Sequence, residues 1–247
     1  MAKGKQTPRQ KMINLMYLVF IAMMALNIDV EIIRSYYDST RALKETRFLT
    51  EQKNEDIFEK TLEAKAQQVP DTYAQPWEDY KGLKTKLDLL VSSTEDIKTT
   101  LKKQSEFIDK DPKTGKDMDV QENFSALNNN EATIDYFFKD GDENTPSAKA
   151  LELKKRMDDV RSYINTKFGS NEQLKKMVER ANTSLSAEYA NGKSPNGKTW
   201  FQNKFYNQPL IAAMSNLEII QNDARNVQSD ALALMLQEKV DASIKFN

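Results

Sequence analysis

The chain has 247 residues, of which 39% are hydrophobic and 30% charged, and its formal net charge is -1. Because 36 Lys and Arg residues nearly balance 37 Asp and Glu residues, charge gives no reason to expect nucleic acid as a partner. The absence of Cys and His excludes disulfides, thiolate or imidazole metal sites, and Ser–His or Cys–His nucleophile pairs. We therefore expect no enzymatic activity, no cofactor and no metal. Few Gly and Pro residues among long Lys-, Glu-, Leu- and Ala-rich tracts predict an all-α fold.

The first segment of interest, residues 12–28, reads MINLMYLVFIAMMALNI and contains no charged residue. At about 1.5 Å per residue it spans roughly 25 Å, the short end of a transmembrane helix. The preceding residues include Lys3, Lys5, Arg9 and Lys11, whereas Asp29 and Glu31 follow. The positive-inside rule then makes residues 1–11 a cytoplasmic tail and places residues 29–241 in the periplasm. This predicts a single-pass protein of the inner membrane.

A cleaved signal peptide is the main alternative, because it shares the basic start and the apolar run. No A-x-A-like cleavage site closes the run, since Ala22 and Ala25 are three residues apart. The helical pattern also continues beyond the run, through Ile32, Tyr36 and Leu43. A transmembrane helix that continues into a periplasmic helix is therefore the favoured interpretation.

The start of this helix carries a capping signal. Thr7 can be the N-cap, Pro8 suits the first helical position, and Gln10 completes a capping box. Arg9 then lies in the first turn, where a cation opposes the helix dipole. It is either an ordinary membrane anchor or the ion-pair partner of a carboxylate on another protein.

Polar amides occur on two faces of the predicted span. At 100° per residue, Asn27 shares a face with Arg9, and Asn14 lies nearly opposite. Polar groups on two faces indicate contact with protein on both sides. The predicted partner contacts are Asn14, Met16, Tyr17, Phe20, Met23 and Asn27.

Apolar residues at alternating spacings of four and three predict a bundle of long helices in residues 29–241. One helix is expected from Trp77 to Ile108, after Pro70 and Pro76 have separated it from the first. Another should open with Thr145 as its N-cap and end near Gly169, and a capping box at Ser170 should restart it. The last should begin near Gln208 or Pro209 and carry an apolar stripe of Ala213, Leu217, Ile220, Ala224, Val227, Ala231 and Leu234. Residues 242–247 alternate like a strand and suggest the start of a following domain.

Two further patterns were weighed as sites. The acidic loop after Asp109 fails as an EF-hand, because Thr114 stands where Gly is required and Val120 where Glu is required. An aromatic group near residue 200 could form a ligand platform, but such groups more often close the end of a bundle. Its members are Trp200, Phe201, Phe205 and Tyr206.

The block from Lys5 to Asn27, KQTPRQKMINLMYLVFIAMMALN, closely resembles the N-terminus of the GldM/PorM family of gliding-motility and type IX secretion motor proteins of Bacteroidota. The resemblance implies a homodimer whose two transmembrane helices lie inside a ring of five copies of a polytopic GldL/PorL-type protein. It further implies a motor driven by the proton gradient, which acts on periplasmic and outer-membrane components. In the family, the arginine that matches Arg9 is thought to pair with an intramembrane glutamate of the ring protein.

Two other functions stay open at the level of sequence. A membrane-anchored periplasmic sensor would bind a small ligand in its helical bundle, although such receptors normally have a second membrane span. A passive anchored scaffold would need no energy coupling. Neither is excluded by the composition.

Overall fold

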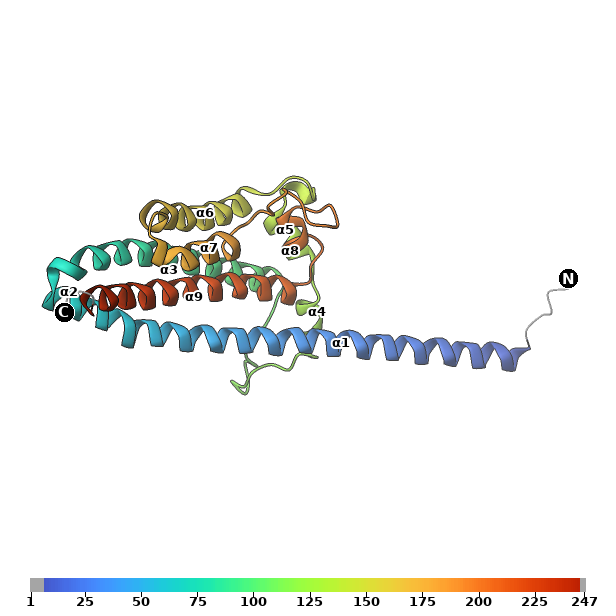
Figure 1. The fold of residues 1–247 in the computed structure, drawn as a ribbon. Coiled ribbons are helices and arrows are strands. Elements are labelled where there is room, and N and C mark those ends of the chain that lie inside the picture. The colour runs from blue at the N-terminus through green and yellow to red at the C-terminus, as the bar shows by residue number, and fades with distance from the viewer. Residues whose placement is uncertain (1–6, 245–247) are drawn as a thin grey trace.

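The computed structural model describes the backbone of residues 7–244 and the side chains of residues 7–21 and 30–237. Within these residues every regular element is helical, which confirms the all-α class. The long helices α1 (Pro8–Lys53), α3 (Pro70–Gln104) and α9 (Leu210–Ile244) form the body of a bundle, and α1 extends far beyond it (Figure 1). The remaining elements are η1 (Asn54–Glu59, a π-helical turn), α2 (Lys60–Gln68), α4 (Phe124–Leu127), α5 (Glu131–Phe137), η2 (Lys139–Gly141), α6 (Ala148–Phe168), η3 (Glu172–Leu174), α7 (Lys175–Ser184) and α8 (Trp200–Phe205).

The predicted start and continuity of the first helix are confirmed. The Thr7 hydroxyl accepts a hydrogen bond from the Gln10 amide N–H, and the Gln10 side chain accepts one from the Thr7 N–H, each at 3.3 Å. From this capping box α1 runs unbroken for 46 residues. We call its residues 8–29, which extend beyond the bundle in Figure 1, the arm.

Among the residues with described side chains, no helix is both long and apolar enough to cross a membrane. The predicted span at residues 12–28 falls partly on residues 22–28, whose side chains lie outside the described set. It therefore stays a prediction.

The predicted break at the two prolines is wrong in part. The chain does turn at Val69, but α3 already begins at Pro70, and Pro76 lies inside the helix. Pro70 occupies the first helical position, where a missing N–H costs no hydrogen bond. Pro76 removes only the bond to the carbonyl of Thr72, near a half-exposed helix start that tolerates the loss.

Other boundaries also differ from the prediction. The N-cap of α6 is Ser147 rather than Thr145, whose hydroxyl instead donates to Asp142. The next restart is capped by Asn171 rather than Ser170. Residues 242–244 continue α9 as a helix, so the expected strand is wrong for them, and residues 245–247 lie outside the described residues.

The predicted apolar stripes form the main core. Each residue of the predicted α9 stripe from Ala213 to Ala231 is at most 4% exposed, and Leu153 and Ile164 of α6 are fully buried. On α3, the stripe from Leu83 to Leu101 is equally buried. Helix α9 therefore forms the axis of the bundle.

The aromatic group closes one end of this core, as predicted. Phe205 stacks on Phe137 of α5, with ring centroids 3.8 Å apart. Trp200 packs edge-on against both Phe201 and Phe205, and all three are at most 9% exposed. These rings fill the bundle end from which α9 starts.

A long connection, residues 105–123, crosses the outside of α1 where the arm enters the bundle, and we call it the strap. Its Val120 packs with Ile33 of α1 and Ile211 of α9 in a small second core. Asp119 forms an ion pair with Arg34 at 3.5 Å. The strap therefore holds α1 against the bundle at the base of the arm.

Candidate functional site

In residues 8–21, whose side chains the structure describes, the arm exposes apolar side chains around its whole circumference. In its described part, large side chains from Met12 to Ile21 have 49–68% of their surface exposed. Exposing so much apolar surface to water is energetically unfavourable, and such a surface marks a site of contact with protein or lipid. The arm therefore needs a partner or a membrane around it.

The structure describes the side chains of five of the seven predicted contact residues. Arg9 lies in the first turn of α1 with an exposed side chain. The exposed side chains along the arm include Asn14, Met16, Tyr17 and Phe20. The side chains of Met23 and Asn27 lie outside the described residues. No partner chain is present, so the roles of all seven residues stay predictions.

A second feature joins the arm's helix to the rest of the molecule. A network of polar side chains, here called the polar seam, links α1 to α9 and α3. Its members are Arg47 and Glu51 on α1, Asn54 on η1, Asp88, Glu95 and Lys98 on α3, and Glu218, Gln221 and Arg225 on α9.

Glu218 is the centre of one half of the polar seam. Its carboxylate is 1% exposed and accepts hydrogen bonds from Arg47 of α1 and Lys98 of α3, both at 2.6 Å. Lys98 also donates to Gln221 at 2.7 Å and to Glu95 at 2.8 Å. One carboxylate thereby connects three helices.

Arg225 is the centre of the other half. It pairs with Glu51 of α1 at 2.5 Å and with Asp88 of α3 at 2.6 Å. Its backbone carbonyl also accepts a hydrogen bond from Asn54 in the π-helical turn, at 3.0 Å. Because these pairs require specific groups opposite one another, they fix α1 in one register against α9.

Lys98 of the polar seam favours the charged form of its neighbour Glu95. Burial alone would raise the pKa of Glu95, but the hydrogen bond from Lys98 and its charge hold that pKa below the ordinary value. Buried charges are stable only when paired in this way. The polar seam is therefore a set of mutually dependent ions.

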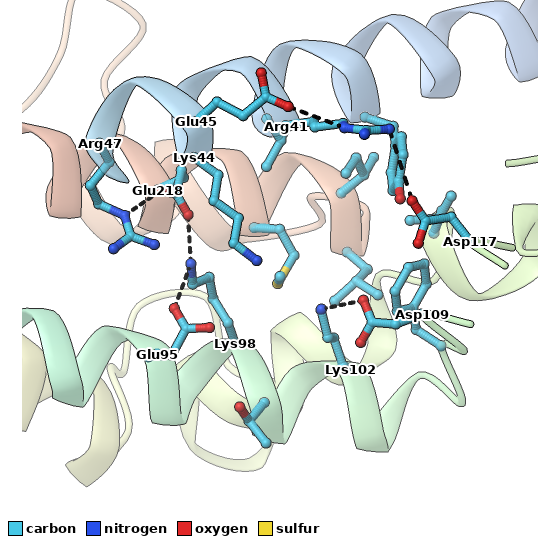
Figure 2. A pocket seen from close by; sticks show the side chains of 18 of the residues that line it. Arg41, Lys44, Glu45, Arg47, Glu95, Lys98, Lys102, Asp109, Asp117 and Glu218 are labelled. Atoms are coloured by element: carbon cyan, nitrogen blue, oxygen red, sulfur yellow. Dashed lines mark hydrogen bonds and ion pairs between the residues drawn. The ribbon is translucent and has the colours of Figure 1, made fainter. Parts of the chain in front are cut away.

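A cavity of about 970 Å³ opens beside the polar seam (Figure 2). It lies between α1 and α3, α9 forms its floor, and residues of the strap contribute to its lining. Lys98 and Glu218 reach it from the polar seam, and Lys44 points into it from α1. Within the described residues, no group of His, Cys, Asp and Glu has the arrangement of a metal site.

The bundle itself matches a known family. Residues 31–238 match the family model described as the GldM N-terminal domain. The chain belongs to the GldM family. This match begins after the residues on which the resemblance of the N-terminus depends, so the two observations are independent.

Membership in the GldM family associates the chain with gliding motility and type IX secretion. A comparison of the chain with curated proteins found no match.

Sequence reasoning missed the polar seam of this GldM-family bundle, although a signal for it exists. Glu218, Gln221, Arg225 and Gln228 each follow directly after a residue of the apolar α9 stripe. A polar row beside an apolar row on the same helix indicates a helix covered on more than one side. The cavity had no such signal, because its walls come from distant segments.

A titrating group on the far side of α9 gives a stability prediction for the bundle. Burial raises the pKa of Asp223 to about 6, against the attraction of Arg180 and Lys204. The folded state thus binds this proton more tightly than the unfolded state, so the group destabilises the fold above pH about 6 and ceases to do so near pH 4. Asp223→Asn should therefore stabilise the protein at pH 7.5 by about 1 kcal/mol, after allowance for solvent screening.

Urea unfolding at pH 7.5 and at pH 4 would measure this effect. The gain from Asp223→Asn should vanish at the lower pH, whereas Asp96→Asn, a change of an exposed carboxylate on α3, should give no pH-dependent gain. An equal gain at both pH values would contradict the assignment.

Proposed function

We propose that the chain is an inner-membrane motor subunit that couples the proton gradient to gliding motility and type IX protein secretion. In this proposal residues 12–28 of the arm form a transmembrane helix, with the N-terminus in the cytoplasm and the bundle in the periplasm. The chain acts as a homodimer whose transmembrane helices lie within a ring of five copies of a GldL/PorL-type polytopic protein. Its role is mechanical rather than enzymatic.

The continuity of α1 is the observation that carries this proposal. One unbroken helix has exposed apolar side chains at one end and the buried polar seam at the other. Force applied to the arm therefore reaches α9 through ion pairs and packing, with no flexible linker between them. A passive membrane anchor would not need this rigid connection.

In this mechanism the group that carries the proton belongs to the partner protein. Residues 8–28 contain no Asp or Glu, and Arg9 stays charged at physiological pH. A carboxylate of the ring protein would be favoured in its ionised form beside Arg9 and in its neutral form beside apolar residues such as Phe20. Rotation would then alternate these two environments, driven by ~2.3 kcal/mol per charge per 100 mV of membrane potential.

Arg9→Ala tests the coupling. We expect gliding and secretion to be lost while the protein still reaches the membrane and still copurifies with its ring partner, because only the charge contact is removed. Native mass spectrometry of the complex from mild detergent would establish that assembly is intact and give its stoichiometry. Lys11→Ala is the matched control, since it removes a neighbouring cation that the mechanism does not use.

Wild-type gliding and secretion in Arg9→Ala cells would show that Arg9 is only a membrane anchor, and would refute its role in coupling the proton gradient to movement. Recovery of the chain without any ring protein would favour a sensor or a scaffold. Crosslinking between the subunits that responds to collapse of the proton gradient would separate the motor from a static scaffold.

A further inference from the structure

The cavity beside the polar seam has the shape of a groove between two helices. Its walls are α1 from Tyr37 to Phe48 and the end of α3 with the start of the strap, from Glu95 to Phe107. At 1.5 Å per residue each wall is about 16–18 Å long. The floor on α9 includes Ile211 and Met214, but these are only 3% and 8% exposed, so the apolar surface within reach of a ligand lies mainly on Phe48 and Phe107. The groove is therefore long enough for about three turns of helix.

Positive charge exceeds negative charge around this groove. Its lining contains seven cations and five carboxylates. Each carboxylate already has a cationic partner within 4.0 Å. The cations are Arg41, Lys44, Arg47, Lys98, Lys102, Lys103 and Lys110, and the carboxylates are Glu45, Glu95, Asp109, Asp117 and Glu218.

Three of these cations are left without a carboxylate among the described residues: Lys44, Lys103 and Lys110. They come from α1, the end of α3 and the strap. In Figure 2 the ammonium group of Lys44 points away from α1 into the space between Lys98 and Lys102. All three are exposed, and because they come from separate elements around one cavity they favour a ligand with several negative groups over a single anion.

Two aromatic side chains in the walls add a second requirement. Phe48 exposes 56% of its surface at the edge of the groove, and Phe107 is only partly buried. A ligand that fills the groove must therefore cover aromatic and aliphatic surface while presenting carboxylates to the walls. An amphipathic helix with acidic flanks meets both requirements, as in other helix-in-groove complexes.

We propose that this groove binds an acidic amphipathic helix of about 11 residues from a partner protein, with its apolar face covering Phe48 and Phe107 and its carboxylates facing the lysines of α1, α3 and the strap. This proposal does not depend on the motor function, because it rests on the groove alone. It gives the bundle a docking site at the junction of α1, α9 and the strap.

Two synthetic peptides test the charge requirement. The first is an amphipathic helix with Leu and Phe on one face and Glu on its flanks, and the second has Gln in place of every Glu. Fluorescence anisotropy with the full chain in amphipol should detect binding of the Glu peptide, weakened about tenfold or more by a rise in salt from roughly 0.05 M to 0.5 M. The Gln peptide should bind about tenfold more weakly at low salt.

Variants locate the site. Lys44→Gln combined with Lys103→Gln should weaken the Glu peptide about tenfold, because both lysines lose their charge without losing a structural partner. The control pair Lys175→Gln and Lys176→Gln changes the net charge equally on the exposed part of α7 and should leave binding unchanged. Because the chain has no Cys, a photo-crosslinker on Thr99→Cys would report occupancy of the groove directly.

The proposal is overturned if the Glu and Gln peptides bind equally, if no binding is detected, or if both lysine pairs have the same effect. It is also overturned if the crosslinker on Thr99→Cys attaches only to a second copy of this chain, since the occupant would then be the dimer partner. A salt-sensitive crosslink of the Glu peptide at Thr99→Cys, lost in the Lys44 and Lys103 variant, would support it.

Discussion

Replacement of Glu218 by alanine is expected to lower the free energy of unfolding by about 3–5 kcal/mol, because it leaves buried cations without their carboxylate. Arg47 and Lys98 both bind this carboxylate at 2.6 Å, and their side chains are only 11% and 5% exposed. Their remaining partners, Glu51 and Glu95, are themselves partly exposed and already engaged. The loss should therefore far exceed that of a surface ion pair.

Urea unfolding followed by circular dichroism, in one detergent throughout, would measure this loss. The control is Glu152→Ala, which breaks an exposed pair with Arg156 and should cost less than about 1 kcal/mol. Replacing Arg47, Lys98 and Glu218 together by Leu or Met should recover most of the stability, because no buried charge is left unpaired: Glu51 keeps Arg225, and Glu95, which loses Lys98, is half-exposed. Equal effects of the two single alanine variants would show that Glu218 does not bind as described.

Ser35→Pro is expected to abolish gliding and secretion while the protein still inserts and the bundle still folds. Ser35 lies on an exposed face of α1 where the arm meets the bundle. A proline there removes the hydrogen bond to the carbonyl of Glu31, clashes with that carbonyl, and kinks the helix at a cost of about 3 kcal/mol. If α1 works as a rigid connection, the kink stops the transmission of force from the arm to the bundle, while Arg9 and the polar seam stay unchanged.

Motility and secretion assays in cells, with membrane levels measured alongside, would check this prediction. Ser35→Ala serves as the control, since it makes the same position a better helix former and should behave as wild type. Normal motility in Ser35→Pro cells would mean that force does not pass along α1. Loss of the folded bundle, detected by protease digestion, would instead assign the defect to stability.

The main helices could be predicted from sequence because their apolar residues recur at regular spacings. The α9 stripe through Leu217, Ala224 and Val227 and the capping box at Thr7 are local patterns, and the structure bears them out. Pro76 misled the prediction, because a single proline early in a long, well-packed helix costs less than the packing gains. Local rules fail where tertiary packing decides the outcome.

The same distinction between local patterns and tertiary packing applies to the candidate site. The exposed residues of the arm, such as Arg9 and Phe20, could be predicted because their placement depends only on one continuous helix. The groove could not, because it brings together residues 37–48, 95–117 and 210–218. Their relative positions depend on how α1, α3 and α9 pack, and no single segment carries that information.

The length of α1 sets the scale of any movement it transmits. Its 46 residues form a rod about 68 Å long, of which the strap and polar seam hold the far part rigidly in the bundle. A tilt of about 10° about the first turn would displace the last turn sideways by about 12 Å, roughly the diameter of a helix with its side chains. A small change of tilt at the first turn is thus amplified by geometry alone into a sideways displacement of about one helix diameter at the end of α1 that lies in the bundle.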